Sequence, residues 1–305
     1  MLQQLARRWQ IHINRQHAGS DWERGIMVKI LADELIENNK YICRNSSIYF
    51  SCILKNKADG IIWGNQKDSP DFLLVWSPYQ EGFQLMGQPL PKEDWMGFRI
   101  WFDHTIIPFL NEQKLDYFEY GTDTEELADM FRQIFIDINI FSANQKFFYW
   151  SGTSIELQPP AGYEIKKIDR LFLKKEYQNM ESILDELKRA YGDIESYFEH
   201  GIAYAAIYDN TVAARADMLF HDNGYGNISV NTEQDHRQKG LSAYLTNKTI
   251  EETCKLGLQP IWDCTDDNLA SENTAKKCGF HMMREDVISW FMINRNKSVL
   301  HTLSR

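Results

Sequence analysis

The sequence lacks the patterns that mark membrane, secreted and zinc-binding proteins. No run of about 18 apolar residues occurs, so no segment is predicted to span a membrane. The five cysteines are odd in number and no two have C-x-x-C spacing, which favours neither a disulfide framework nor a thiolate zinc site. The histidines show no ligand spacing, and the first residues contain no apolar signal-peptide core. We therefore expect a cytoplasmic protein without a metal site.

Basic residues are also in the minority. The chain has 33 Lys and Arg against 43 Asp and Glu, a formal net charge of −10. A negative chain repels phosphate backbones, so nucleic acid and anionic membranes are not the expected partners. The same charge suits a cationic acceptor such as an amine, although many cytosolic proteins are acidic without any such partner. The oligomeric state is left open.

A change in sequence pattern predicts two domains. A chain of 305 residues exceeds the usual size of one domain. The Pro-Pro pair and glycine in Gln158–Gly162 interrupt the pattern of strands and helices. We expect an N-terminal α/β domain at residues 1–155 and a second domain at residues 156–305.

The second domain alternates between strand-like and helix-like segments, in a mixed α+β layout. The expected strands are Tyr163–Ile168, Ile202–Tyr208, Val212–Phe220, Gly226–Thr232 and Gln259–Asp263, followed by a hairpin of Phe280–Arg284 and Val287–Ile293. The expected helical segments are Leu171–Leu173, Met180–Phe198, Gly240–Leu256 and Asn268–Lys277. A single helix joins Gly226–Thr232 to Gln259–Asp263, which predicts that these two strands are parallel.

The turn at Arg237-Gln238-Lys239-Gly240-Leu241-Ser242 carries the clearest chemical signal. It stands between the end of a strand and the start of a helix, where unpaired N–H groups and the helix dipole favour an anion. Gly240 lets the backbone approach a phosphate closely, and Ser242 is small. The motif predicts a phosphate-binding turn, with an ordinary solvated turn as the alternative.

Residues 163–293 resemble the GNAT acyltransferase superfamily in element order. Arg237–Ser242 matches its acyl-CoA pyrophosphate motif, and Asn268–Ser271 with Ala275–Phe280 is similar to its second motif, N-x-x-[AS]…GF. Gly257–Pro260 and Trp262–Cys264 resemble one subgroup, the zwittermicin A resistance acetyltransferases. The resemblance implies a GNAT-like mixed sheet with flanking helices. It also implies transfer of an acetyl group from acetyl-CoA to the amine of a small molecule.

The resemblance also implies which residues hold the cofactor. Backbone amides would hold the pyrophosphate, strand residues would pair with the pantetheine amides, and the second motif would lie beside the pantetheine arm. The implied cofactor-binding residues are Ile228, Val230, Arg237, Gln238, Lys239, Gly240, Leu241, Ser242, Ala243, Asn268 and Ser271.

The sequence departs from the family pattern at two positions. Ser242 stands where Gly or Ala is usual, and Ala275 stands seven positions after Asn268, where many members have a general-acid tyrosine. A serine is still small enough for CoA. Without the tyrosine, water could protonate the leaving thiolate, because the pKa of the CoA thiol is low enough. A non-catalytic acyl-CoA sensor or interaction protein is therefore the alternative function.

An acceptor amine must lose a proton before or during its attack on a thioester, so the site requires a base or a water chain. The candidate bases are Glu233 and Asp263, with His236 and Asp217 as further possibilities. Each carboxylate also has a simpler interpretation, because Glu233 could solubilise a loop and Asp263 could brace one. Cys264 is predicted to be a buried, inert thiol rather than an acyl acceptor.

The first half repeats part of this element order. Its expected elements are strands at Phe72–Trp76, Phe83–Met86, Leu115–Tyr120 and Phe147–Trp150, with helices at Glu93–Trp101 and from the capping box Thr122–Glu125 to Phe135. The order suggests a degenerate copy of the same fold. Its turn, Gly87–Pro91, contains two prolines that lack the amide donors a pyrophosphate requires. We expect no CoA site there. The dense aromatic residues of this half are interpreted as core rather than as a base-stacking surface.

Overall fold

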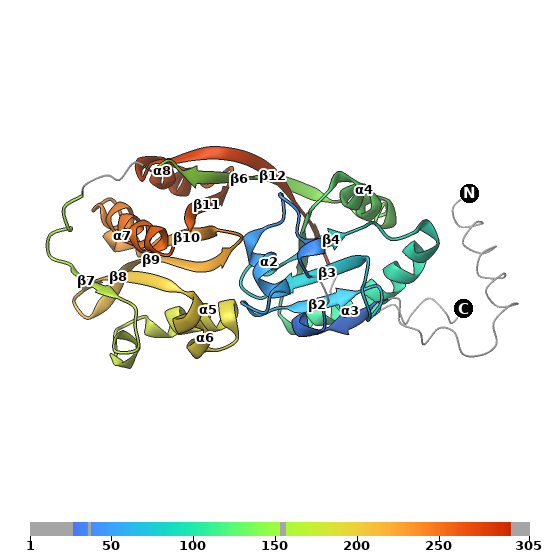
Figure 1. The fold of residues 1–305 in the computed structure, drawn as a ribbon, viewed down its shortest axis with the longest axis horizontal. Helices are drawn as coiled ribbons and strands as arrows, with labels where there is room; N and C mark the ends of the chain where they lie inside the picture. The colour runs from blue at the N-terminus through green and yellow to red at the C-terminus, as the bar shows by residue number, and fades with distance from the viewer. Residues whose placement is uncertain (1–26, 36–37, 153–156, 294–305) are drawn as a thin grey trace, which may run out of the picture.

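The protein folds around one long sheet (Figure 1). The computed structural model describes residues 27–35, 38–152 and 157–293. Within these residues twelve strands are hydrogen-bonded in the order β1-β2-β3-β4-β5-β12-β6-β11-β10-β9-β8-β7. Figure 1 shows the two halves of the chain side by side along the longest axis, with α2 between them.

The two halves contain nearly the same sequence of elements. The N-terminal half contains β1 (Val28–Ile30), η1 (Ala32–Glu34), η2 (Asn38–Tyr41), α2 (Ile48–Leu54), β2 (Ile61–Gly64), β3 (Phe72–Ser77), β4 (Gly82–Gly87), η3 (Lys92–Asp94), α3 (Trp95–Glu112), β5 (Tyr117–Thr122), α4 (Glu125–Ile134) and β6 (Phe141–Trp150). The C-terminal half contains β7 (Glu164–Lys167), η4 (Phe172–Lys174), α5 (Met180–Tyr191), α6 (Ile194–His200), β8 (Ile202–Tyr208), β9 (Thr211–Asp222), β10 (Tyr225–Thr232), η5 (Gln234–His236), α7 (Leu241–Lys255), β11 (Gln259–Thr265), α8 (Leu269–Lys277) and β12 (Phe280–Met292).

Each half includes one parallel crossover of strand, helix and strand. In the C-terminal half α7 joins β10 to β11, and the two strands pair in parallel, which confirms the prediction from the sequence. In the N-terminal half α3 joins β4 to β5, which also pair in parallel. A connection of this kind places its helix against one face of the sheet.

The two halves exchange their last strands. β12, from the C-terminal half, pairs with β5 of the N-terminal half, and β6 pairs with β11 of the C-terminal half. β6 and β12 also pair with each other and cross from one half to the other in Figure 1. The sheet is therefore continuous through both halves.

Three local expectations are wrong. Phe280–Ile293 is not a hairpin: β12 is one strand with a bulge near Met282–Arg284, and Glu285 and Asp286 pair with β6 rather than forming a turn. The helix expected over Met180–Phe198 is interrupted at Gly192, whose φ of 78° ends α5, and Asp193 caps α6. The N-cap of α4 is Thr124 instead of Thr122, because Thr124 accepts the Leu127 N–H.

Within the described residues, buried aromatic side chains dominate the core of the first half, as the sequence predicts. Phe98, Phe102, Phe118 and Phe131 are fully buried and lie between α3, α4 and the sheet. Ring centroids of Phe102 and Phe118 are 4.9 Å apart, in an edge-to-face arrangement. Phe291 of β12 belongs to the same core, so the exchanged strand contributes to the packing of the other half.

Candidate functional site

The strands β10 and β11 separate from each other part of the way along their length. They pair only from Tyr225 with Gln259 to Asn227 with Ile261. β10 stays paired with β9 as far as Thr232, and the register shifts between Asn227 and Ile228, as at a β-bulge. Bulges of this kind bend a strand and end its pairing. Within the described residues, Ile228–Thr232 therefore has one edge without a strand partner.

A cleft of about 670 Å³ lies at this open end of the two strands. It is formed by the end of β10, the turn before α7, the first turn of α7 and one side of α8. The predicted cofactor residues that line it are Val230, Arg237, Gln238, Gly240, Leu241, Ser242, Ala243, Asn268 and Ser271. Ile228 lies in the core below the cleft, and Lys239 does not line it. Nine of the eleven predicted residues thus line one cleft.

The backbone of the turn is shaped to present N–H groups to the cleft. Gly240 is the N-cap of α7, with φ of 79°, and a Cβ added there would meet no atom within 4 Å. Gln238 also has a positive φ, of 61°, which is uncommon for a residue other than glycine. The first amides of α7 have no partner within the helix, and Gly240 leaves the approach to them open.

Side chains around the turn hold its shape. Arg237 Nε donates to the Thr232 carbonyl at 3.1 Å, and Lys239 Nζ donates to the Asp235 carbonyl at 2.9 Å. Ser242 Oγ is 2.9 Å from Thr232 Oγ1, so the position that differs from the family pattern ties the helix to β10. Both basic side chains are exposed and add positive charge beside the helix N-terminus.

The second predicted motif forms the opposite wall of the cleft. Asn268 caps α8 by accepting the Ser271 N–H at 3.1 Å. Ser271 Oγ accepts from Trp262 Nε1 at 3.0 Å, which fixes α8 on β11. Ala275 is fully buried in the core with Trp262 and Phe280. The position where many relatives have a tyrosine is therefore filled by a small core residue.

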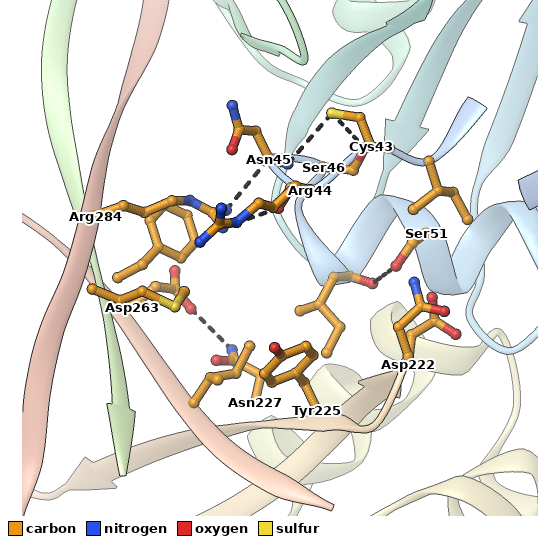
Figure 2. Close-up of a pocket in the computed structure, with 16 residues that line it drawn as sticks. Cys43, Arg44, Asn45, Ser46, Ser51, Asp222, Tyr225, Asn227, Asp263 and Arg284 are labelled. Atoms are coloured by element: carbon orange, nitrogen blue, oxygen red, sulfur yellow. Dashed lines mark hydrogen bonds between the residues drawn. The ribbon is translucent and has the colours of Figure 1, made fainter. Parts of the chain in front are cut away.

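A second cavity, of about 520 Å³, lies between the two halves (Figure 2). The loop before α2, α2 itself, the β9–β10 turn, β11 and β12 all line it. Ile228 and Trp262 pack on the α7 side of the sheet, whereas Asn227 and Asp263 contact α2. Since neighbouring strand residues point to opposite faces, this cavity lies on the other face of the same two strands.

Asp263 is the candidate base that lines the interface cavity. Its Oδ1 accepts from Tyr49 Oη at 2.9 Å and from Asn227 Nδ2 at 3.0 Å, and Gln145 donates to its Oδ2. Burial raises the pKa of Asp263, and these three hydrogen bonds and the charge of Arg284 offset part of that rise. The carboxyl is thus held in a fixed orientation, with a proton affinity above that of a solvated aspartate.

The other candidate bases lie elsewhere. Glu233 is exposed, lines neither of the two cavities, and accepts from Asn179 Nδ2 at 3.2 Å. Asp217 is buried beside Arg215, 2.8 Å away, and Ser229, and burial raises its pKa. His236 lines the cofactor cleft, with its Nδ1 2.8 Å from Tyr163 Oη.

Cys264 is buried, as the sequence predicts. Burial also raises the pKa of its thiol, which keeps it protonated and unreactive.

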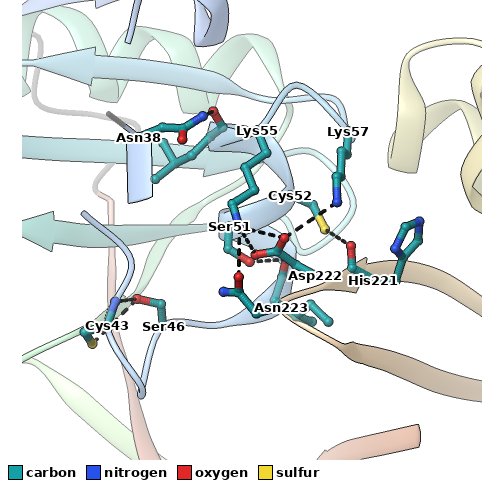
Figure 3. A network of polar contacts seen from close by, with 12 residues as sticks. Asn38, Cys43, Ser46, Ser51, Cys52, Lys55, Lys57, His221, Asp222 and Asn223 are labelled. Carbon is teal, nitrogen blue, oxygen red and sulfur yellow. Dashed lines mark hydrogen bonds and ion pairs between the residues drawn. The ribbon is translucent and has the colours of Figure 1, made fainter. Parts of the chain in front are cut away.

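The interface between the halves is fixed by an ionic network near the cavity (Figure 3). At the end of α2, Lys55 Nζ lies 2.8 Å from Asp222 of β9, and Lys57 Nζ lies 3.6 Å from the same carboxylate. Lys55 also donates to Asn223 Oδ1 at 3.1 Å. The Cys52 thiol donates to the His221 carbonyl. These contacts set the position of α2 on the C-terminal half.

Sequence reasoning missed three residues around Asp263. Tyr49, Asn227 and Gln145 come from α2, β10 and β6, and no motif marks them. The one signal in the sequence is that Asn227 and Asp263 fall on two strands predicted to be parallel neighbours, where they can share a face.

Among the described residues, no cluster of His, Cys, Asp and Glu is suited to a metal ion. In the same part of the chain no helix is long and apolar enough to cross a membrane.

The continuous sheet, the separated parallel strands and the turn at Gly240 define an acetyltransferase with a GNAT-like fold. A model of the GNAT acetyltransferase family matches residues 39–287. The chain belongs to this family. The match extends over both halves, including α2 and the interface cavity.

The chain is also similar to one curated relative over part of its length and to two solved structures in fold. An uncharacterized N-acetyltransferase of Bacillus subtilis (strain 168), YdfB, is 24% identical over 132 residues, 43% of this chain and 49% of that protein. The chain thus spans about half the length of this curated relative. The fold is similar to a GCN5-related N-acetyltransferase-like protein from Streptococcus suis 89/1591, with a TM-score of 0.58 and 18% identity over 86% of this chain and 99% of that one.

A tandem GNAT protein from the clavulanic acid biosynthesis pathway has a similar fold over nearly the whole chain. Its TM-score is 0.56, with 8% identity, over 89% of this chain and 100% of that one. The expected GNAT-like mixed sheet with flanking helices is confirmed.

Proposed function

We propose that the protein is an acetyl-CoA-dependent N-acetyltransferase that acts on the amine of a small molecule. The observation that carries the proposal is that the open edge of β10 and the turn at Gly240 face one cleft. A strand edge without a partner suits the amides of an extended pantetheine arm, and a helix N-terminus suits its pyrophosphate. Family membership supports the same activity. We extend the likeness to the zwittermicin A resistance subgroup as part of this proposal.

Each part of the cofactor has a matching part of the cleft. Backbone amides from Gln238 to Ala243 would hold the pyrophosphate, with Arg237 and Lys239 supplying charge nearby. Ile228–Val230 would pair with pantetheine, and a backbone N–H there would polarise the thioester carbonyl. Asn268 and Ser271 would lie along the other side of the arm. The thioester would then reach the point where β10 and β11 separate.

Asp263 is the candidate base that this arrangement favours over Glu233. Asp263 lies two residues beyond Ile261, the last residue of β11 that pairs with β10, and lines the interface cavity, whereas Glu233 is exposed and accepts a hydrogen bond from Asn179. The amine nitrogen would attack the thioester carbonyl carbon, form the C–N bond and give one proton to Asp263. The C–S bond would break, and the CoA thiolate would leave and take a proton from water. A raised carboxyl pKa brings this base nearer to neutral pH, where proton transfer is most effective.

The N-terminal half is proposed to be a degenerate copy that walls the acceptor site and binds no CoA. β4 and β5 pair up to Leu85 and Thr122, and the Asp123 N–H then bonds to the Leu85 carbonyl, so these strands do not separate as β10 and β11 do. In the turn after β4, the Gln88 and Leu90 amides already have acceptors, and Pro89 and Pro91 have no amide proton.

We propose that the chain divides into two domains, residues 1–155 and 156–305, which exchange their last strands.

The five cysteines are all free thiols, which suits the reducing cytoplasm expected from the sequence.

Thermal melting with acetyl-CoA tests the proposed function. A site filled at about 100 times its Kd stabilises the folded state by about 2.7 kcal/mol. Release of CoA thiol across a panel of small amines then separates an enzyme from a sensor. A melting shift without any thiol release would support the alternative, a non-catalytic acyl-CoA sensor, which Ala275 keeps open. No shift at millimolar acetyl-CoA would contradict both.

A further inference from the structure

One buried polar atom at the floor of the interface cavity has no partner. Asn227 is only 4% exposed and lines the cavity, yet its Oδ1 has no hydrogen bond to any described residue. A buried acceptor without a donor costs free energy, so native proteins seldom keep one without a reason. Because Asn227 lines a cavity of about 520 Å³, a donor on a ligand bound there is the group that could satisfy this oxygen.

The orientation of the Asn227 amide is fixed by its neighbours. Its Nδ2 donates to Asp263 Oδ1 at 3.0 Å and to Tyr49 Oη at 2.6 Å. A carboxylate accepts hydrogen bonds only, so the nitrogen of the amide must face Asp263 and the oxygen must face away. Asn227 therefore offers an acceptor, and a ligand that meets it must bring an N–H or O–H donor.

Tyr49, which belongs to the N-terminal half, hydrogen-bonds to both Asn227 and Asp263. Its hydroxyl donates to Asp263 Oδ1 and accepts from Asn227 Nδ2, which closes a triangle of three hydrogen bonds. Its ring packs edge-on against Phe220, with centroids 4.8 Å apart. Burial, with the charge of Asp263 added, raises the pKa of Tyr49, so its hydroxyl stays protonated. Tyr49 can thus orient the carboxylate but is a poor proton carrier.

We propose that Asn227 Oδ1 accepts an N–H from the acceptor amine, and that Tyr49 of the N-terminal half positions Asn227 and Asp263 for proton removal. The chemical class of ligand is an amine small enough for the cavity, with at least two N–H groups, one for Asn227 and one for Asp263. The inference rests on the proposed function. The active site would then be formed by both halves of the chain, because Tyr49 comes from the N-terminal half and Asn227 and Asp263 come from the C-terminal half.

Two variants and one matched control separate the roles in steady-state kinetics. Tyr49→Phe removes one hydroxyl and leaves the ring. It should lower kcat by about 10- to 100-fold, as expected for a hydrogen bond to a charged group, and leave the KM of acetyl-CoA unchanged. Asn227→Leu should raise the KM of the amine about tenfold. Tyr79→Phe is the control, because Tyr79 stacks 5.9 Å from Tyr49 and bonds Glu186 rather than Asp263.

A titration tests the positioning role without any acceptor. The groups facing Asp263 are Tyr49 from α2, Gln145 from β6, Asn227 from β10 and the cation Arg284 from β12. Loss of the Tyr49 donor should raise the pKa of Asp263 in a ¹³C NMR titration of its carboxyl carbon. The low-pH limb of the kcat/KM profile should move upward with it. Tyr79→Phe should change neither, and an unmoved Asp263 in Tyr49→Phe would overturn the positioning role.

Binding of the amine is tested in crystals of the CoA complex soaked with propylamine. The expected result is density for the amine nitrogen within hydrogen-bond distance of Asn227 Oδ1, and an empty cavity or an amine bound elsewhere would overturn that contact. Failure of the proposed function has a different signature. In that case acetyl-CoA gives no melting shift, while the effect of Tyr49→Phe on the Asp263 titration is still observed.

Discussion

Tyr49 and Asp263 are 214 positions apart in the chain, and the Tyr49 hydroxyl donates a 2.9 Å hydrogen bond to Asp263 Oδ1. The contact joins α2 of the N-terminal half to β11 of the C-terminal half, and Asp263 lines the cavity between them (Figure 2). The N-terminal half therefore does more than pack against the C-terminal half, because its Tyr49 orients the candidate base Asp263.

Replacement of Asp263 tests the choice of base. Asp263→Asn keeps the volume and most hydrogen bonds of the side chain but removes its capacity to take a proton. We expect kcat to fall by about 10²-fold or more, as is typical for loss of a general base. Glu233→Gln should have little effect, because Glu233 is exposed and lines neither cavity. The measurement is thiol release at saturating acetyl-CoA. The opposite order of the two variants would assign the base to Glu233.

Replacement of Gly240 tests the cofactor turn. Gly240→Val places a branched side chain over the first amides of α7, at a residue with φ of 79°. The melting shift with acetyl-CoA, expected at about 2.7 kcal/mol near saturation, should disappear. Gly257→Val is a matched control at the other end of α7, with φ of 73° and equally open space around an added Cβ. Both variants should lose similar stability without ligand, and a shift that persists in Gly240→Val would mean that the site is misplaced.

The element pattern around this turn was predictable because its causes are local. Gly257 and Asn268 end and begin helices through their own backbone and side chain, so the bounds of α7 and α8 follow from the sequence. The helical crossover between β10 and β11 likewise required a parallel pair.

The course of β12 and the hydrogen bonds around Asp263 were not predictable, because they depend on contacts between segments that are distant in the sequence. Glu285 and Asp286 have the composition of a turn, yet they pair with Lys146 and Gln145 of β6, a strand from the other half. The triangle around Asp263 was hidden for the same reason. Nothing near Tyr49 in the sequence shows that its hydroxyl meets side chains of β10 and β11.

Stability as a function of pH tests a buried carboxyl in the N-terminal half. Asp123 is 5% exposed and accepts from Gln84 at 2.7 Å and Ser46 at 2.5 Å. Burial raises its pKa to about 6 from an ordinary value of 3.8. The folded state therefore binds more protons than the unfolded state between these values. The free energy of unfolding should fall as pH rises through this window, by up to about 3 kcal/mol.

The measurement is urea unfolding from pH 4 to pH 7 in wild type and in Asp123→Asn, which resembles the protonated side chain. The variant should lose this part of the pH dependence and be relatively more stable at the upper end. Asp129→Asn, at an exposed position on α4, should follow the wild type. Parallel curves for Asp123→Asn and wild type would contradict the predicted proton uptake.

Removal of the carboxylate at the interface tests whether α2 is held by the network in Figure 3. Asp222→Ala leaves Lys55 with only Asn223, in a site where the Lys55 side chain is 16% exposed. A partly buried cation without its partner should lower the free energy of unfolding by about 3 kcal/mol. Because α2 carries Tyr49, the variant should also lose activity at temperatures where it remains folded, with the acetyl-CoA melting shift retained.

The control is Glu251→Ala, which breaks an exposed pair with Lys248, 3.4 Å apart, and should change the free energy of unfolding by less than about 1 kcal/mol. Wild-type activity in Asp222→Ala would show that α2 keeps its place by packing alone.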